Sequence, residues 1–210
     1  DVFIQVADIF FDLVPHFQDL QVLDMGGGFK VPYHANEKGT DIQLLAKKVG
    51  EVLNKFEITY GKKFQVWFEP GKYLVSQCGY LITSVNVIKE TPTVLFAGIN
   101  SGFNHLIRPM FYEAYHPIRN ISNPNGPIKN YAVTGNICET DNFAWDRPMN
   151  EIRENDLLVI DNAGAYGFEM GSNYNSRFLP AQVLFKEDQL HLIRKRDTLE
   201  DLLKNQIELN

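Results

Sequence analysis

The fold of the first part of the chain is decided by the stretch QVLDMGGG, residues 21–28. Its first five residues form a short apolar run of the kind that becomes a buried strand, and three glycines end that run abruptly. A second run, QVWF at 65–68, stops in the same way at EPG, residues 69–71. Both runs therefore predict strands that end in tight loops.

Segments with helical periodicity precede both expected strands, at 2–13 and 41–60. For the second helix, Thr40 and Gln43 have the spacing of a capping box, and Gly61 stands where a C-terminal glycine cap belongs. Alternating helices and strands are typical of parallel strands joined by helical crossovers. Because two strands cannot complete such a sheet, we expect this segment to be one piece of a larger α/β structure.

The chain opens inside the first of these helices. Apolar residues follow helical spacing from Val2 onward, with no capping residue before them. Natural chains rarely begin in the middle of a helix. We therefore expect the sequence to represent a truncated protein.

From about Gly79 onward the pattern changes to short β-rich runs separated by turn residues. The expected strands are 81–88, 94–96, 131–134, 157–160, 181–185 and 189–194. This spacing predicts an antiparallel sandwich or barrel, and a helix at about 199–205, capped by Thr198, closes the chain. The sequence thus divides into an α/β domain at 1–78 and an all-β domain at 79–210.

Composition argues against several classes of function. A net charge of −6 provides no electrostatic basis for binding nucleic acid or an anionic membrane surface. No uninterrupted apolar run in the 210 residues is long enough to cross a bilayer. The two cysteines, Cys78 and Cys138, do not suggest a disulfide framework, so we expect a reducing, cytoplasmic environment.

Two candidate binding groups stand at the ends of the expected parallel strands. The glycines at 26–28 would let backbone N–H groups approach an anion such as a phosphate, but a tight turn without a ligand fits equally well. Glu69 could face a pyridine nitrogen and keep it protonated, which carbanion chemistry on that ring requires. A solvated turn acid is the equally weighted alternative.

Further candidates lie in the β-rich part. Arg108 and Tyr112 would share one face of a helical turn and could bind a carboxylate, unless they are a surface arginine and a packed tyrosine. Cys138 could donate a proton and Glu139 could bind an ammonium group, although a lone cysteine is more often a small buried hydrophobic residue. Tyr166 protrudes from a loop of small residues.

Two histidines and one polar run are expected to be structural. His105 and His116 lack neighbouring ligands at metal-binding spacing, so the sequence predicts no metal site. The run SNYNSR at 172–177 predicts a loop that its own side-chain hydrogen bonds hold in order.

Taken in chain order, these motifs resemble those of the diaminopimelate decarboxylase family. The matching motifs are GGG at 26–28, EPG at 69–71, LIRP at 106–109 with Tyr112, YHP at 115–117, CE at 138–139, AGAYG at 163–167 and SNYNSR at 172–177. The family consists of enzymes dependent on pyridoxal 5'-phosphate (PLP) with the alanine-racemase-like fold. The resemblance extends from about Leu23 to Lys186 and implies the last part of a PLP-binding TIM-type barrel followed by a C-terminal β domain. The N-terminal barrel portion would be absent from this chain.

The resemblance also implies an activity and a role for each residue. The activity is decarboxylation of meso-2,6-diaminopimelate to L-lysine by a homodimer that shares its active sites across the interface. The cofactor PLP would be bound by Gly26, Gly27, Gly28, Glu69, Gly71, Lys72 and Tyr166, with Glu69 at the pyridine nitrogen. The amino-acid substrate would be bound by Arg108, Tyr112, Glu139 and Tyr166. Cys138 would be the catalytic residue that returns a proton to the substrate in the partner's site.

The chain departs from the family pattern in two places. Lys72 follows the EPG motif where the family commonly has arginine, so the charge is kept but the bidentate fork is lost. The family's cofactor-binding lysine lies near the first barrel strand, and nothing in this chain corresponds to it. The isolated chain is therefore expected to be inactive.

Several alternatives remain open. An ornithine, arginine or carboxynorspermidine decarboxylase is the nearest, although Arg108 with Tyr112 favours a substrate that carries a second carboxylate. A non-catalytic decarboxylase-like binding protein would usually lack residues such as Glu69 or Cys138, which are present here. A free-standing β-domain binding module would leave the strand edges of the first part unpaired.

Overall fold

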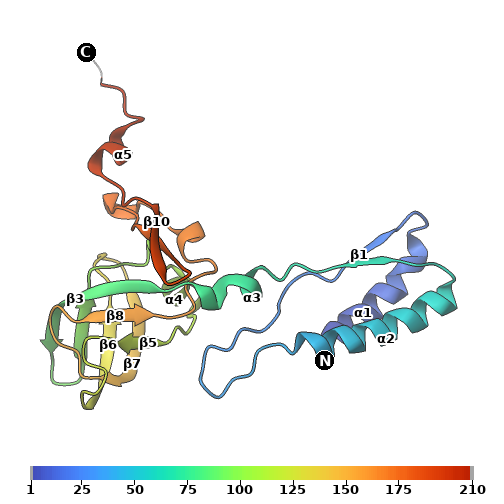
Figure 1. Ribbon diagram of the computed structural model, residues 1–210, viewed down its shortest axis with the longest axis horizontal. Coiled ribbons are helices and arrows are strands. Elements are labelled where there is room, and N and C mark those ends of the chain that lie inside the picture. The colour runs from blue at the N-terminus through green and yellow to red at the C-terminus, as the bar shows by residue number, and fades with distance from the viewer. Residues whose placement is uncertain (1, 209–210) are drawn as a thin grey trace. The chain divides into compact units, whose positions relative to one another are not determined.

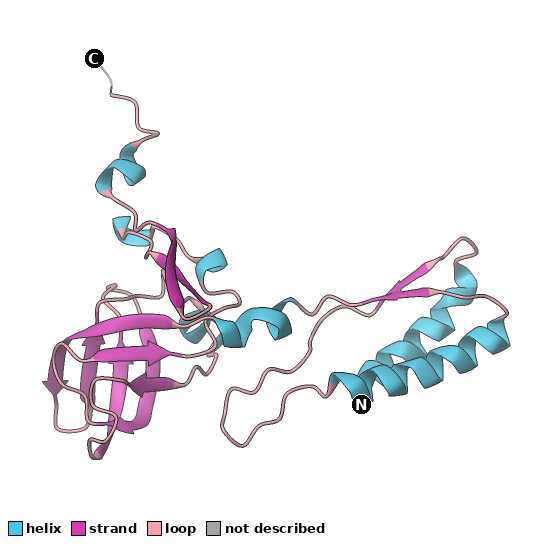
Figure 2. Ribbon diagram, in the orientation of Figure 1, coloured by secondary structure: helices cyan, strands magenta, loops and turns pink. Residues whose placement is uncertain are grey.

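A computed structural model describes residues 2–208 of the chain, coloured along the sequence in Figure 1 and by secondary structure in Figure 2. The described residues fold as two compact units that divide between Val75 and Ser76. We call them the α/β unit, up to Val75, and the β unit, from Ser76 onward. Residues 76–78 belong to the β unit because the Gly164 N–H donates to the Ser76 carbonyl at 3.1 Å.

The α/β unit alternates helices and strands as the sequence predicts. Its elements are α1 (Val2–Leu13), η1 (Val14–His16), β1 (Val22–Asp24), α2 (Ile42–Tyr60), β2 (Gln65–Trp67) and α3 (Gly71–Val75). β1 and β2 pair in parallel, with Val22 opposite Gln65. The expected parallel strands with a helical crossover are therefore confirmed.

One expected detail of α2 is wrong. Asp41, not Thr40, caps the helix, because the Asp41 carboxylate accepts the Leu44 N–H at 2.9 Å. The Thr40 hydroxyl instead accepts the Lys30 N–H at 2.7 Å and so ties the preceding loop together. Gly61 does end the helix in the left-handed conformation, with φ of 79°.

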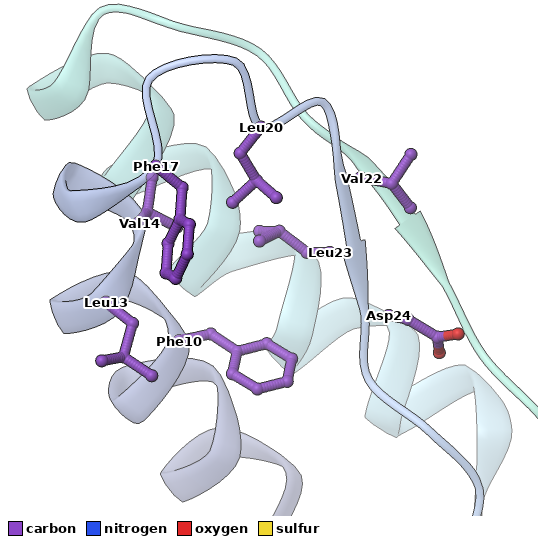
Figure 3. Close-up of a pocket in the computed structure, with 8 residues that line it drawn as sticks. All are labelled: Phe10, Leu13, Val14, Phe17, Leu20, Val22, Leu23 and Asp24. Atoms are coloured by element: carbon purple, nitrogen blue, oxygen red, sulfur yellow. The ribbon is translucent and has the colours of Figure 1, made fainter.

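The core of the α/β unit is small. Its buried cluster consists of Phe29, Leu45 and Val49, with Phe3, Ile4 and Tyr73 packed against it. A pocket of about 240 Å³ opens between α1, η1 and β1, and Figure 3 shows its lining side chains. They are Phe10, Leu13, Val14, Phe17, Leu20, Val22, Leu23 and Asp24. Because all but Asp24 are apolar, the pocket offers no set of convergent polar groups.

The β unit is built on a six-stranded sheet. The strands are β3 (Leu81–Glu90), β4 (Leu95–Ile99), β5 (Ile118–Asn120), β6 (Ile128–Thr134), β7 (Asn142–Asn150) and β8 (Leu157–Ile160). They follow the order β5-β8-β3-β4-β6-β7, and the two end strands β5 and β7 also contact each other, so the sheet nearly closes. Its interior holds a continuous core that includes Ile99, Tyr131, Val133, Leu158 and Ile160.

The expected β domain is correct in outline and incomplete in detail. β4 and β6 pair in parallel, so the sheet is not purely antiparallel. The sequence reading missed β5, which is only three residues long, and β7. β7 contains Pro148 and Asp146, the latter with a positive φ of 47°, and both residues are unusual within strands. An end position in the strand order explains how β7 accommodates them.

The chain ends in a hairpin and a short helix. β9 (Gln182–Lys186) and β10 (Gln189–Arg194) pair antiparallel, as expected. α5 (Leu199–Leu203) begins at Thr198, whose side chain and that of Asp201 cap each other's backbone N–H groups. None of the helices described between residues 2 and 208 has the length and apolar character needed to span a bilayer.

Candidate active site

The loops that follow β1 and β2 are joined by backbone hydrogen bonds. The Met25 N–H donates to the Trp67 carbonyl at 2.9 Å, and the Glu69 N–H donates to the Gly26 carbonyl at 2.8 Å. Both loops therefore leave the carboxyl ends of adjacent parallel strands, where α/β barrels place their active sites.

Backbone geometry accounts for each of the three glycines. Gly26 and Gly28 have φ values of +68° and +87°, which side-chain-bearing residues rarely adopt. A Cβ atom on Gly27 would lie 2.6 Å from the Glu69 carbonyl oxygen. A close backbone cradle of this kind fits a phosphate group. The Gly26 N–H donates to the Asp24 carboxylate at 2.9 Å, so the amides of Gly27 and Gly28 are the better candidates for an anion.

The other cofactor candidates of the α/β unit follow β2 directly. The Glu69 side chain is exposed, and Gly71 begins the short helix α3. The Lys72 ammonium group lies 5.9 Å from the ring centroid of Tyr33. An acid and a cation thus follow the same strand within one short loop.

In the β unit, the structure brings together Arg108, Tyr112 and Tyr166. The predicted helical turn forms as α4 (Arg108–Tyr112). The Arg108 guanidinium lies 5.9 Å from the Tyr112 ring centroid and 5.8 Å from the Tyr166 ring centroid. Tyr166 reaches this position from the loop after β8 with a positive φ of 55°. A guanidinium flanked by two phenols is suited to holding a carboxylate.

Cys138 and Glu139 lie exposed in the loop between β6 and β7. The Cys138 thiol donates to Glu139 Oε2 at 3.5 Å. Glu139 Oε1 accepts the hydroxyl of Tyr174, and this hydrogen bond lowers the pKa of the Glu139 carboxyl below its ordinary value. The same bond raises the pKa of the Tyr174 phenol. The pair therefore favours an anionic Glu139.

Asp141 is a buried residue that sequence reasoning missed. Its carboxylate accepts the Phe103 N–H at 2.8 Å and the Ile137 N–H at 3.1 Å, and its carbonyl accepts the Gly135 N–H at 2.7 Å. Burial raises the pKa of this carboxyl, while the two amide donors oppose the rise. Asp141 thus holds the backbone that leads into Cys138 and links it to the backbone at Phe103. Its position at the end of a turn, where Asp commonly accepts backbone N–H groups, was the available signal.

The run at 172–177 is a loop that only partly supports itself. The Asn173 side chain donates to the Arg177 carbonyl at 2.9 Å, as expected of an internally bonded loop. Tyr174 and Asn175 instead face the neighbouring loop, where the Asn175 amide lies 3.7 Å from Cys138 Sγ. The sequence did not identify either residue as part of the site.

His105 and His116 pack within the β unit. The His105 ring contacts the Ser101 hydroxyl and the Phe178 carbonyl, each at 2.9 Å. The His116 ring contacts the Asp161 carbonyl at 2.9 Å. Burial lowers the pKa of both rings. Among residues 2–208 no group of three or more His, Cys, Asp or Glu side chains is arranged to hold a metal ion.

The fold and these loops match one class of enzyme. The family model described as "Pyridoxal-dependent decarboxylase, C-terminal sheet domain" matches residues 30–164. The chain belongs to this family of pyridoxal-dependent decarboxylases.

Within the family, the similarity is to diaminopimelate decarboxylases, as the motifs indicated. The relative from Methanothermobacter thermautotrophicus is 42% identical over 191 residues, which is 90% of this chain and 44% of that protein. A crystal structure of a diaminopimelate decarboxylase matches with a TM-score of 0.89 and 35% identity, covering 96% of this chain and 51% of the other. The Helicobacter pylori structure, complexed with L-lysine, matches with a TM-score of 0.78 and 34% identity, over 95% of this chain and 48% of that one. The chain therefore spans about half the length of the proteins that it matches.

Proposed function

We propose that this chain is part of a PLP-dependent carboxy-lyase that converts meso-2,6-diaminopimelate to L-lysine. The observation that carries the proposal is the presence of two side-chain clusters of opposite charge preference in the β unit. One, around Arg108, is suited to a carboxylate. The other, around Glu139, is suited to an ammonium group. A substrate whose distal end carries both groups satisfies both clusters.

The α/β unit would bind the cofactor. The amides of Gly27 and Gly28 would hold the phosphate, with Gly71 and Lys72 close by, and Glu69 would face the pyridine nitrogen. When bound, PLP supplies an electron-withdrawing ring that accepts the electron pair left by departing carbon dioxide. The cradle and the strand-end position of Glu69 support these roles.

The β unit would bind the substrate and return a proton to it after carbon dioxide has left. Arg108 and Tyr112 would hold the distal carboxylate, with Tyr166 against the cofactor or substrate. Glu139 would hold the distal ammonium group. Cys138 Sγ would return a proton to the carbon that has lost carbon dioxide, because its exposed thiol can reach a group outside its own loop.

We also propose a homodimer in which Cys138 and Glu139 of one subunit serve the site of the other. Oligomers of identical subunits are most often two-fold symmetric dimers, so such a site would occur twice. Cys78 and Cys138 are both exposed and are not joined in a disulfide, which agrees with a reducing compartment such as the cytoplasm.

The substrate is tested by measuring carbon dioxide release from meso-diaminopimelate and from ornithine by the full-length protein. We expect faster turnover of diaminopimelate, because ornithine has no distal carboxylate for Arg108. An Arg108→Lys variant keeps the charge and loses the bidentate fork, so its preference for diaminopimelate should narrow. Faster turnover of ornithine by the unaltered protein would refute the proposed substrate.

A further inference from the structure

We propose that Tyr174 and Asn175 are positioning residues for Glu139 and Cys138, and that the loop at 172–177 thereby selects substrates with a distal ammonium group. The inference rests on the proposed roles of Glu139 and Cys138. Neither Tyr174 nor Asn175 needs to touch the substrate, because each acts through the residue that it contacts.

Tyr174 determines the direction and charge of Glu139. Its hydroxyl donates to Glu139 Oε1 from a position far along the chain, while the Cys138 thiol donates to Oε2 at 3.5 Å. A carboxylate offers about four lone-pair sites, so two donors leave acceptor capacity for an ammonium group. Both donors bind the ionised Glu139 carboxylate more strongly than the protonated acid. The carboxylate is therefore held anionic and oriented before a substrate arrives.

Asn175 faces Cys138, the second residue that this loop positions. Its side-chain amide lies 3.7 Å from Cys138 Sγ and is oriented to donate to the sulfur. Asn175 and Ser176 are consecutive residues with positive φ values of 53° and 55°. Two adjacent left-handed residues are uncommon outside glycine, and such conformations cluster at functional sites. Here they turn the loop toward the sulfur.

The loop is anchored independently of these two contacts. The Tyr174 ring packs on the Phe103 ring with centroids 5.4 Å apart, and the Phe103 N–H is held by buried Asp141. The Arg177 guanidinium donates to the Asn136 carbonyl at 3.1 Å. The Asp141 carboxylate also accepts the Ile137 N–H. One carboxylate therefore fixes both Phe103, on which Tyr174 packs, and the backbone that leads to Cys138. This arrangement suits a preorganised site rather than a mobile surface loop.

The test compares Tyr174→Phe with the unaltered full-length holoenzyme on whichever of diaminopimelate, lysine or ornithine it decarboxylates fastest. All three carry a distal ammonium group, so the inference is tested even if the proposed substrate is wrong. We expect KM to rise roughly tenfold, because a hydrogen bond to a charged group is lost, with little change in kcat. The acid limb of the kcat/KM profile should move to higher pH, because the bond that lowers the Glu139 pKa is gone.

Asn175→Ala should change kcat rather than KM, the reverse of Tyr174→Phe. We expect kcat to fall several-fold with KM nearly unchanged, and the solvent deuterium isotope effect on kcat to increase, because only proton return is disturbed. Tyr80→Phe is the matched control, since Tyr80 is an exposed tyrosine of the same unit outside both clusters. Its kinetic constants should equal those of the unaltered protein.

A double-variant cycle with Glu139→Gln tests whether Tyr174 acts through Glu139 or only supports the structure of the loop. If Tyr174 acts through Glu139, adding Tyr174→Phe to Glu139→Gln should change KM by much less than tenfold. L-lysine affinity, measured by calorimetry, should follow the same pattern without any turnover. Equal KM, acid limb and lysine affinity in Tyr174→Phe and the unaltered protein would overturn the inference. So would full additivity in the cycle.

Discussion

The α/β unit and the β unit differ in how each supports its candidate groups. In the α/β unit, the glycine loop and Glu69 follow two short strands, and the buried cluster of this unit is Phe29, Leu45 and Val49. In the β unit, six strands enclose a continuous core. Side-chain hydrogen bonds from Cys138 and Tyr174 to Glu139 hold the loop that carries Cys138. A two-stranded sheet is marginal in water, whereas a nearly closed six-stranded sheet is not. The β unit therefore carries its candidate groups on the more stable framework.

This difference has a consequence for stability. Large apolar side chains remain exposed in the α/β unit, including Ile9 at 58% and Trp67 at 56%. Its β1–β2 sheet contains three residue pairs only. We expect the α/β unit to unfold at lower denaturant concentration than the β unit.

The largest effect is expected from Leu158→Ala in the core of the β unit. Leu158 is completely buried in β8, and truncating a buried leucine costs about 2–5 kcal/mol. Its neighbour Leu157 is 42% exposed, so Leu157→Ala is the matched control and should cost clearly less. Urea unfolding of the chain, followed by circular dichroism, measures both. Equal losses would contradict the assignment of the core to this side of β8.

Gly27→Ala tests the glycine loop of the α/β unit. Its Cβ atom would meet the Glu69 carbonyl oxygen, and overpacking of this kind costs about 1–3 kcal/mol. Gly50 lies in α2 with open space at its Cβ position, so Gly50→Ala should instead stabilise the helix by about 0.5–1 kcal/mol. Unfolding midpoints of the two variants should move in opposite directions. In the full-length protein, only Gly27→Ala should weaken PLP binding, measured by cofactor absorbance.

The smallest effect is expected from Glu57→Gln in the α/β unit. The Lys63 ammonium and the Phe64 N–H lower the pKa of the buried Glu57 carboxyl. A lowered pKa contributes stability above the unfolded value and loses it as pH falls through the folded value. The variant should therefore be less stable than the unaltered chain at pH 7 but lose less on acidification. Exposed Glu51→Gln, in the same helix, is the control.

The pKa of Asp141 in the β unit is shifted in the opposite direction to that of Glu57. Burial raises its pKa, so its contribution to stability is present below the unfolded value and is lost as pH rises through the folded value. The stability advantage of the unaltered chain over Asp141→Asn should therefore shrink as pH rises, whereas its advantage over Glu57→Gln should grow. Advantages that both change with pH in the same direction would contradict this contrast.

Local patterns in the sequence predicted the α/β unit more completely than the β unit. Apolar periodicity and the glycine cap placed α2 and both strands, and only the N-cap residue was wrong. In the β unit, β7 was missed because Asp146 and Pro148 interrupt its alternation. The parallel pairing of β4 and β6 is a property of topology that no local pattern records.

Local sequence patterns also predicted only some of the contacts in the candidate site. Arg108 and Tyr112 share a helical turn, so spacing alone suggested their association. The bond between Tyr174 and Glu139 joins residues 35 positions apart, and the Asp141 bond to Phe103 joins residues 38 positions apart. Such pairs depend on how the loops fold together, so motif reading identified Glu139 but not the residues that hold it.

We propose that groups of the α/β unit and of the β unit serve one active site, shared between two copies of the full-length protein. Mixing two inactive full-length variants, Glu69→Ala and Cys138→Ala, and measuring carbon dioxide release after subunit exchange tests it most directly. We expect activity to recover to about a quarter of that of the unaltered protein, since about half of the dimers are mixed and each mixed dimer has one intact site of two. Activity that stays at the level of the separate variants would contradict the shared site.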